Sequence, residues 1–434
     1  MKITELIEKK KQGLALSEEE IYFIVNGAMN GTIADYQLSA FFMAVYFKGM
    51  NLDETTIMTK ATVESGTVLD LSKIGEIVAD KHSSGGVGDK ITLIYLPLVS
   101  ACGVPLAKLS GKGLGHTGGT IDKLNSISGF NCELELDDFL NKVQKVGLAI
   151  ASQTHNLTPA DGKFYALRDV TSTIDIIPLI AVSIVSKKIA SGANCIVLDV
   201  KCGEGAFIKT LEDAKKLSQT MVEVGKRLGK KICAVITNMN EPLGHAIGNS
   251  IEVIEAIEFL KGNYQKDLKE VTYELAIQTL IKTGKAQNRE TAVNMLDNAL
   301  NSGKALQKFS DMIISQGGDV SVIDDYSKFP KAEHIIEIKS EKSGFINHIN
   351  ALEIAKATKL LGAGRTFKDD KIDYAVGIYL NKKTGEYINK GDVAFTIYAN
   401  SLQNIDEVKQ KAQGAFVIEE NKKTLEPLIY DVIG

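Results

Sequence analysis

With 434 residues the chain is too long for one ordinary hydrophobic core, so two or three domains are expected. Apolar residues make up 44% of the chain and charged residues 24%, which is typical of a soluble globular protein. A net charge of −4 without a strong basic run gives no support to nucleic-acid or membrane-surface binding, and no apolar stretch approaches the roughly 20 residues that cross a bilayer.

The first ten residues and the cysteines indicate a cytoplasmic protein. The N-terminal segment is amphipathic and charged, which does not fit a secretory signal peptide. The chain has five cysteines, without a C-x-x-C pair or a zinc-binding spacing. We therefore expect free thiols in a reducing compartment.

Residues 1–65 are predicted to form helices. Ser17 followed by Glu20 fits a capping box that opens a helix. Residues 35–47 form a helix whose apolar residues cover more than one face, so we expect it to pack inside its domain and against something else. A subunit partner and a deeper core both fit that pattern. Another helix is predicted for residues 53–64.

Two glycine-rich loops each follow a predicted strand. A short β-branched strand at residues 77–79 leads into the loop of residues 80–89, and a strand at 104–109 leads into residues 110–120, which hold five glycines in eleven positions. A helix at residues 90–102 separates the loops. This alternation is typical of an α/β fold, in which anions bind at the carboxyl ends of strands.

The polar side chains of these loops are suited to holding an oxyanion. The first loop holds Lys81, His82 and Ser83, and the second begins with Ser110 and ends with Thr120. Glycine lets backbone N–H groups approach a ligand closely, so the two loops predict a phosphate site. Neither loop matches the nucleotide-binding P-loop or the dinucleotide fingerprint.

Residues 155–195 interrupt the α/β pattern. A predicted helix in this segment places Ser183 and Lys187 four residues apart, on one face. Taken alone, Lys187 is interpreted as a solvated surface lysine, and Arg168 with Asp169 as a local ion pair.

The second half of the chain returns to α/β and then changes character. Strands are predicted at residues 195–200 and 232–237, with amphipathic helices between and after them. From about residue 335 the pattern alternates as strands do. Residues 385–397 resemble the hairpin of a biotinyl/lipoyl-like unit without its modified lysine, so we expect a structural β-rich lobe.

Several motifs together resemble one enzyme family. Residues 110–130 (SGKGLGHTGGTIDKLNSISGF) resemble the signature of the thymidine and pyrimidine-nucleoside phosphorylases, and residues 80–89 resemble that family's first phosphate loop. Residues 165–170 and 183–188 resemble its base-recognition segments. The resemblance covers nearly the whole chain, and its length and spacing are closer to the bacterial pyrimidine-nucleoside enzymes than to the strict thymidine enzymes.

The resemblance implies a reaction and a fold. The reaction is reversible phosphorolysis of a pyrimidine nucleoside (uridine, thymidine or deoxyuridine) in pyrimidine salvage, in which phosphate attacks C1′ with inversion and gives the free base and an α-sugar-1-phosphate. Phosphate is the co-substrate and no organic cofactor is implied. The implied fold is an α/β fold in three parts, acting as a cytoplasmic homodimer whose contact is the 35–47 helix. The parts are a small all-helical domain (1–65 plus 160–193), a large α/β domain with a mixed sheet (75–155 plus 194–330) and a β-rich α+β lobe (345–434).

The resemblance also assigns residues to the two substrates. It assigns phosphate to Lys81, Ser83, Thr92, Lys108, Ser110 and Thr120. It assigns the edge of the base to Arg168, Ser183 and Lys187, and the walls around the base to Leu114, Tyr165, Ile180 and Phe207. His82 is expected beside the base as hydrogen-bond donor or general acid, so the implied catalytic residues are His82, Arg168 and Lys187. A loop-shaping role is expected for His116.

Some members of this family hold a cation beside the first loop, and here the chain departs from the pattern. The matching positions are Gly88, residue 90, Leu243, Ala246 and Glu255. Residue 90 is Lys90, where a hydroxyl ligand is expected. An ammonium group there would repel a metal ion and could replace it, so a structural K⁺ is expected to be bound weakly or not at all.

Three alternative functions remain open at this point. A strict thymidine phosphorylase would differ only in rejecting the 2′-hydroxyl of uridine. An anthranilate-type phosphoribosyltransferase would need paired acidic residues for a diphosphate and magnesium beyond the glycine loop, which the sequence does not provide. A non-catalytic nucleoside-binding protein is disfavoured because Lys81, His82, Arg168 and Lys187 are all present.

Overall fold

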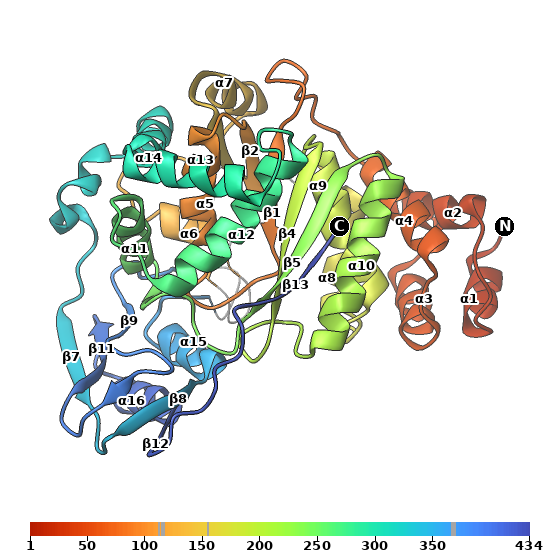
Figure 1. Ribbon diagram of the computed structural model, residues 1–434. Helices are drawn as coiled ribbons and strands as arrows, with labels where there is room; N and C mark the ends of the chain where they lie inside the picture. The colour runs from red at the N-terminus through yellow and green to blue at the C-terminus, as the bar shows by residue number, and fades with distance from the viewer. Residues whose placement is uncertain (112, 114–117, 154–155, 366–369) are drawn as a thin grey trace.

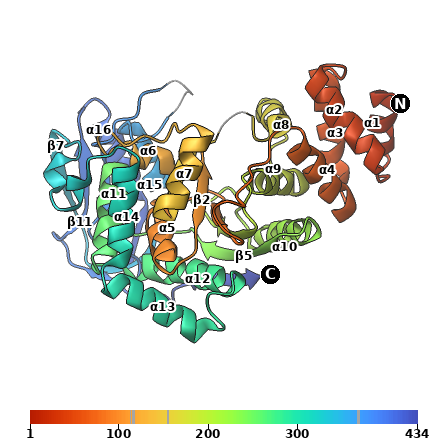
Figure 2. The ribbon, with the colours of Figure 1, turned by 90° about the horizontal axis from the view of Figure 1, so that it is seen from above.

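The computed structural model describes residues 1–111, 113, 118–153, 156–365 and 370–434, and it places the N-terminal helices at one side of the molecule (Figure 1). The helices of this part are α1 (Ile3–Lys11), α2 (Glu18–Asn30), α3 (Asp35–Lys48), α4 (Leu52–Glu64), α8 (Pro159–Asp169) and α9 (Ile177–Ala190). Both α8 and α9 lie between α1–α4 and the central sheet in two perpendicular views (Figures 1 and 2).

The packing of these helices follows from their sequence pattern. The predicted capping box is confirmed: the Ser17 N–H donates to Glu20 Oε2 at 2.7 Å, and Ser17 Oγ accepts from the Glu20 N–H. Phe41 and Phe42 of α3 are fully buried, and the Phe42 ring packs edge-on against Phe164 of α8 at 5.3 Å between centroids. One hydrophobic core therefore joins helices that are about 120 residues apart in the chain.

Within the described residues, a six-stranded sheet forms the centre of the molecule in the order β13-β5-β4-β1-β2-β3. Its strands are β1 (Ala79–Ser83), β2 (Leu106–Ser110), β3 (Leu148–Ser152), β4 (Cys195–Cys202), β5 (Lys231–Asn238) and β13 (Ile429–Ile433). The pairs from β5 to β3 are parallel, whereas β13 pairs antiparallel with β5. The predicted α/β fold with a mixed sheet is confirmed.

Helices cover both faces of this sheet. They are α5 (Ile91–Ala101), α6 (Thr120–Leu124), α7 (Leu136–Val146), α10 (Leu211–Arg227), α11 (Ser250–Leu260), α12 (Lys266–Lys282), α13 (Arg289–Asn301) and α14 (Lys304–Ser315), with 3₁₀ turns η1 (Val320–Ile323) and η2 (Tyr326–Lys328). In β4, Cys195 and Val197 pack on the side of α5 and α12, while Ile196 and Leu198 pack on the side of α9 and α10. Burial on both faces explains the continuous apolar run of this strand.

The first strand is longer than the sequence pattern predicts. The expected strand at residues 77–79 is observed as β1, which begins at Ala79 and continues through Ser83. The ladder with β4 supplies the reason, because every β1 residue has a partner from Cys195 to Asp199. Lys81 and His82, which the prediction assigned to a loop, therefore lie in the strand.

The C-terminal part is the predicted β-rich lobe. Its elements are β7 (His334–Lys339), β8 (Gly344–Ile349), β9 (Gly377–Leu380), β10 (Tyr387–Ile388), β11 (Val393–Ala399), β12 (Phe416–Glu419), α15 (Ala351–Leu360) and α16 (Ile405–Gly414). Strand β6 (Ala246–Gly248) joins the lobe sheet β6-β9-β11-β7 from the α/β domain. In return, β13 leaves the lobe and enters the central sheet, although the predicted boundary of 345–434 assigned it to the lobe.

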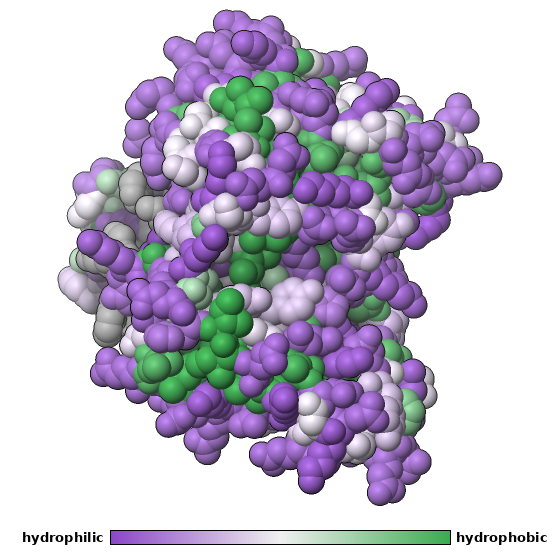
Figure 3. Space-filling model, turned by 90° about the vertical axis from the view of Figure 1, so that its left-hand side faces the viewer, coloured by the Kyte–Doolittle hydropathy of each residue, from purple (hydrophilic) through white to green (hydrophobic). Residues whose placement is uncertain are grey.

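The hydrophilic surface and the lengths of the helices agree with the amino-acid composition, which is typical of a globular protein. Figure 3 views the molecule from the side of the lobe, where hydrophilic residues cover most of the face and apolar residues gather mainly in its lower half. In the parts of the chain that the structure describes, no helix is both long and apolar enough to cross a membrane. The five cysteines are free thiols, as predicted.

Candidate active site

Three parallel strands end at the same edge of the central sheet and gather predicted phosphate residues. β1 pairs with β4 so that Lys81 lies opposite Val197 and Ser83 opposite Asp199. β2 lies on the other side of β1 and carries Lys108 near its end. Because α/β folds bind ligands at the carboxyl ends of their strands, this edge is the candidate active site.

The carboxylate of Asp199 holds two buried lysines. Its Oδ2 atom lies 3.1 Å from Lys81 Nζ and 2.8 Å from Lys201 Nζ, and its Oδ1 atom accepts a hydrogen bond of 2.7 Å from Thr237. All of these side chains are buried. Burial favours the neutral amine of Lys201, but Asp199 and Asp89 outweigh it and raise the pKa of Lys201.

The carboxylate of Asp80 holds a second pair of lysines. Lys108 Nζ lies 3.3 Å from Asp80 Oδ1 and donates to the Lys81 carbonyl at 2.7 Å. Lys188 Nζ donates to Asp80 Oδ2 at 2.7 Å and to the Leu109 carbonyl at 3.2 Å. Burial lowers the pKa of Lys108 to about 7, with Lys188 and Lys81 acting in the same direction against Asp80.

This cluster has a surplus of positive groups. Among the described residues, the carboxylates near these lysines are those of Asp80, Asp199 and Asp89, and they are outnumbered by the four lysines Lys81, Lys108, Lys188 and Lys201. Lys81 Nζ is buried and makes no hydrogen bond within the described residues, although Asp199 is close. Because a buried charge costs several kcal/mol unless it is paired, the cluster is suited to an anion such as phosphate.

The elements on either side of the first glycine-rich loop, β1 and α5, carry hydroxyl groups. Ser83 Oγ donates to Asp89 Oδ2 at 2.6 Å and accepts from the Gly85 N–H at 3.3 Å. Thr92 is buried in the first turn of α5. Burial opposes ionisation of Asp89, but Lys81 and neighbouring lysines hold the pKa of that carboxyl well below its usual range.

The second glycine-rich loop begins at Ser110, at the end of β2, and ends at Thr120, the first residue of α6. The Gly113 N–H donates to Asp122 Oδ2 at 2.8 Å. A Cβ atom at Gly119 would lie 2.2 Å from the Gly113 nitrogen and 2.3 Å from Asp122 Oδ2, so only glycine fits there. Gly113 and Gly119 thus both lie against the Asp122 carboxylate.

The C-terminal lobe reaches this loop through Arg365. The guanidinium binds Asp122 with two hydrogen bonds, of 3.0 Å from Nη1 to Oδ2 and 2.8 Å from Nη2 to Oδ1. Such a bidentate pair fixes both partners in orientation. Leu114 and His116 lie outside the described residues.

Lys187 is positioned by groups from α8 and α9, the two helices that carry residues predicted to bind the base. Its Nζ atom lies 2.7 Å from Asp161 Oδ2 of α8 and donates to Ser183 Oγ at 2.8 Å. The side chain is 28% exposed, so it is neither fully solvated nor buried. Its Nζ also lies 6.0 Å from the centroid of the Tyr165 ring. The interpretation of Lys187 as a solvated surface lysine is wrong, because a carboxylate and a hydroxyl hold it.

Arg168 is buried and bonded to backbone. Its Nε donates to the Thr173 carbonyl at 2.8 Å, and its terminal nitrogens donate to the carbonyls of Leu179 and Ile174. Burial lowers the pKa of Arg168 to about 10. The interpretation of Arg168 and Asp169 as a local ion pair is not what the structure shows: the guanidinium instead holds the chain that leads into α9.

His82 follows Lys81 in β1. Burial and the nearby charges of Lys188, Lys108 and Lys187 hold the pKa of His82 well below its usual range, so the imidazole is neutral at pH 7. Lys187 belongs to α9 and Lys108 to β2. The charges of a helix residue predicted to bind the base and of a strand residue predicted to bind phosphate thus both act on the His82 imidazole.

Only some of the residues predicted to surround the base lie on neighbouring elements. Tyr165 on α8 and Ile180 on α9 are half-buried on neighbouring helices. Phe207 lies in the connection between β4 and α10 with 53% of its side-chain surface exposed. The roles of all these residues in binding phosphate and base stay predictions.

The positions matched to a cation site are also close together. Lys90 Nζ donates to the Leu243 and Ala246 carbonyls, both at 2.8 Å, and to Glu255 Oε2 at 2.7 Å. Gly88 approaches the same carbonyls, since a Cβ atom there would lie 2.4 Å from the Leu243 oxygen. Among the described residues, no group of three or more His, Cys, Asp or Glu side chains could hold a metal ion.

Sequence reasoning missed five charged residues of the site: Asp80, Asp161, Lys188, Asp199 and Lys201. Two of them carried a usable signal, because Asp199 and Lys201 stand at the end of a buried apolar strand, where charge is rare. Lys188 follows the predicted Lys187, but only the three-dimensional structure places it against Asp80.

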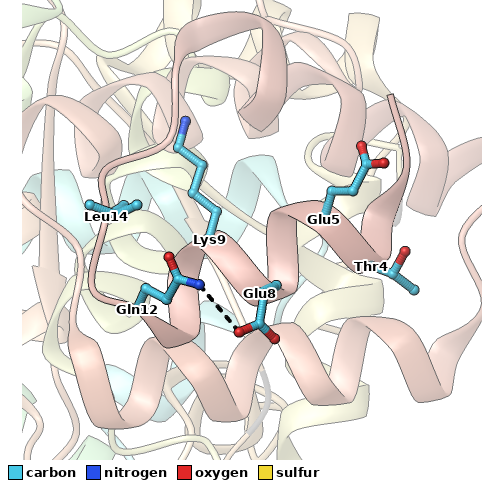
Figure 4. Close-up of a pocket in the computed structure, with 6 residues that line it drawn as sticks. All are labelled: Thr4, Glu5, Glu8, Lys9, Gln12 and Leu14. Carbon is cyan, nitrogen blue, oxygen red and sulfur yellow. Dashed lines mark hydrogen bonds between the residues drawn. The ribbon is translucent and has the colours of Figure 1, made fainter.

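A surface pocket on α1 lies apart from the residues of the candidate active site. Figure 4 shows its lining residues, Thr4, Glu5, Glu8, Lys9, Gln12 and Leu14, all from α1 and the turn after it. Gln12 donates to Glu8 at 3.4 Å along the helix surface. Neither glycine-rich loop contributes to this pocket, so it is not the candidate active site.

Family models match the chain in three segments. The "Glycosyl transferase family, helical bundle domain" matches residues 4–66, and the "Glycosyl transferase family, a/b domain" matches residues 75–306, more than half of the chain. The "Pyrimidine nucleoside phosphorylase C-terminal domain" matches residues 345–419.

Curated relatives match over the whole length. The pyrimidine-nucleoside phosphorylase of Geobacillus stearothermophilus is 51% identical over 434 residues, covering 100% of both chains. That of Staphylococcus epidermidis is 49% identical over 433 residues, also covering 100% of both. A solved structure, anthranilate phosphoribosyltransferase from Thermus thermophilus, is 17% identical with a TM-score of 0.59, covering 71% of this chain and 98% of that one, which shows a shared fold alone. The chain belongs to the pyrimidine-nucleoside phosphorylase family.

Proposed function

We propose that this chain catalyses the reversible phosphorolysis of pyrimidine nucleosides to the free base and an α-(deoxy)ribose-1-phosphate. The observation that carries the proposal is the buried cluster of Lys81, Lys108, Lys188 and Lys201 around two carboxylates at the ends of β1, β2 and β4. Curated relatives about half identical to the chain carry the name of this activity, which agrees with such a site.

In this proposal the lysine cluster and the loop hydroxyls hold phosphate for attack on C1′. Lys81 and Lys108 supply charge from the strands, and Ser83, Ser110 and Thr120 supply hydroxyls from the loop ends. Holding the nucleophile in a fixed orientation removes much of the entropic barrier to the reaction. The sugar develops positive charge as the glycosidic bond breaks, and the bound phosphate anion lies close enough to stabilise it.

Negative charge develops on the leaving base. As the C1′–N1 bond breaks, electron density moves into the pyrimidine ring, and Lys187 stabilises it as a cation held by Asp161 and Ser183. His82 is neutral in the free protein, so it acts as a hydrogen-bond donor, and bound phosphate favours its protonated form. Arg168 supports the base side by holding the start of α9.

Closure of a cleft is part of this proposal. The phosphate residues belong to the central sheet, whereas Lys187, Ser183 and Tyr165 belong to α8 and α9. Lys188, the next residue after Lys187, is bonded to Asp80 of β1. The C-terminal end of α9 is thus anchored to the sheet and can serve as the pivot about which the helical domain closes.

Substrate breadth decides between the broad enzyme and a strict thymidine phosphorylase. We expect phosphate-dependent release of base from uridine, thymidine and deoxyuridine at comparable rates, measured side by side. Release from the deoxynucleosides alone would establish the strict enzyme. The likeness to anthranilate phosphoribosyltransferase concerns the fold and gives that activity no support.

The proposal includes a cytoplasmic homodimer in which α3 packs against its copy. The outer face of α3 exposes Tyr36, Met43, Tyr46 and Phe47, and Tyr36 and Phe47 are 76% and 74% exposed. Exposed apolar patches of this kind mark interaction surfaces. Light scattering at micromolar concentration should give the mass of a dimer, and Phe47→Glu should shift it toward the monomer. A monomeric wild-type protein would contradict the proposed dimer.

A further inference from the structure

Lys90 is a fully buried lysine whose ammonium group lies in a cage of oxygen atoms. Its three contacts are the carbonyls of Leu243 and Ala246 at 2.8 Å and a carboxylate oxygen of Glu255 at 2.7 Å. Backbone carbonyls together with a carboxylate are the ligands that hard cations take in proteins. The ammonium thus occupies a set of oxygen atoms of the kind that binds a cation.

The cage does not depend on Lys90 for its shape. Glu255 accepts hydrogen bonds from the backbone N–H groups of His245 at 2.7 Å and Ala246 at 2.9 Å. In addition, Lys383 of the C-terminal lobe donates to the carbonyls of Pro242 and Gly244. The segment that provides the carbonyls is therefore fixed by bonds that remain when Lys90 is shortened.

The cage also touches the proposed phosphate loop. Lys90 is the residue that precedes α5, and it directly follows Asp89, which holds Ser83. The Leu243 N–H donates to the Val87 carbonyl at 3.1 Å, so the loop and the cage segment are bonded at a second point. A cation in the cage, whether the Lys90 ammonium or a metal ion, therefore stabilises the loop that follows Ser83.

From these contacts we infer that Lys90 is a built-in replacement for a bound cation, and that this chain needs neither a monovalent nor a divalent cation. The same contacts assign a latent monovalent-cation site to the Leu243 and Ala246 carbonyls with Glu255, which opens when Lys90 is replaced by a shorter side chain. A positive charge at this position is required by the buried Glu255 carboxylate, and the chain supplies it covalently.

Thermal unfolding of the full chain tests the inference without reference to its activity. The protein is treated with EDTA and unfolded in choline chloride or in potassium chloride at equal ionic strength. Wild type should show the same midpoint in both salts. In Lys90→Thr, which leaves room and offers a hydroxyl ligand, K⁺ should raise the midpoint in a saturable way, because a ligand that binds only the native state stabilises it.

Matched variants separate cation binding from a general effect of salt. Lys90→Met fills the space without an oxygen or a charge, so it should lose stability without any specific response to K⁺. Lys90→Thr combined with Glu255→Gln should respond to K⁺ more weakly than Lys90→Thr. If Lys90→Thr is folded only in potassium chloride, that result also supports the latent site.

Activity provides a second readout. Base release by wild type should be equal in the two salts, while Lys90→Thr should be lower by about 10-fold or more in choline chloride and recover in potassium chloride. The inference is overturned if wild type needs K⁺ for its midpoint or its activity, or if Lys90→Thr and Lys90→Met respond to K⁺ alike. Loss of all base release in wild type would sink the proposed function but leave the unfolding test in force.

Discussion

At the scale of single residues, two carboxylates organise the proposed phosphate site. Asp80 and Asp199 each hold two lysine ammonium groups, and all six side chains are buried within the described structure. The role of the two carboxylates is to keep several cations close together at an energetic cost that a bound anion then offsets.

The pKa of Lys108, lowered to about 7, predicts how phosphate binding depends on pH. Bound phosphate stabilises the charged ammonium, so binding takes up a proton and weakens as pH rises above about 7, by up to about tenfold per pH unit. The KM for phosphate should therefore rise with pH in wild type more steeply than in Lys108→Met. Ionisation of phosphate itself affects both proteins equally. Parallel pH profiles would contradict this prediction.

Lys187 should matter for the departure of the base. Lys187→Met should lower kcat/KM by about 100-fold or more, because it removes a preorganised cation from the leaving group. Lys163→Met serves as the control, since Lys163 lies on α8 with a similar exposed fraction but contacts Asp35 and the Ala28 carbonyl instead. The control should stay within about twofold of wild type. Similar losses in both variants would indicate damage to the helices instead.

At this scale, the sequence indicates which kind of ligand the residues can bind, but it does not indicate which residues contact one another. The polar character of Lys81, Ser83 and Ser110 indicated an oxyanion site directly. The partner of Lys81 is Asp199, more than one hundred residues away, and that contact depends on the register between β1 and β4. Local pattern does not encode the register between strands that are distant in sequence.

At the scale of elements, the C-terminal lobe contacts the residue that binds Gly113 of the second glycine-rich loop. Arg365 binds both oxygens of Asp122, and Asp122 in turn accepts the Gly113 N–H. The Asp122 carboxylate is almost fully buried. A residue of the lobe is thus linked through Asp122 to Gly113 in the α/β domain.

Arg365→Lys should weaken phosphate binding although it keeps the charge. A lysine cannot form the two parallel hydrogen bonds, so the loop around Asp122 loses its fixed orientation. The KM for phosphate should rise by about 10-fold, with a smaller change in the KM for the nucleoside. Equal changes in the two values would contradict a specific role of Arg365 in the phosphate loop.

The local sequence pattern predicts some element boundaries correctly and misses others. The capping box of Ser17 and Glu20 and the helix that follows were predictable because the interactions lie within four residues. The extension of β1 to Ser83 was not, because it requires β4 as a partner. The return of β13 to the central sheet likewise depends on β5, almost 200 residues earlier.

At the scale of the whole molecule, the two proposed substrate sides belong to different domains, and α9 contacts both. Lys187 and Lys188 are neighbours in sequence, yet one is bound to Asp161 of α8 and the other to Asp80 of β1. The helical domain with α8 and α9 was recognisable from the sequence only as an interruption of the α/β pattern. Its packing against residues 1–65 came from the family resemblance, and Phe42 with Phe164 supplies the physical contact.

The most direct test of the account is phosphate-dependent release of free base from thymidine, uridine and deoxyuridine by the purified chain. The account predicts release from all three at comparable rates, strict dependence on phosphate, and formation of the sugar-1-phosphate. Lys81→Met, which removes a buried cation of the proposed phosphate site, should abolish most of it. Absence of release, or release that continues without phosphate, would contradict the proposed phosphorolysis.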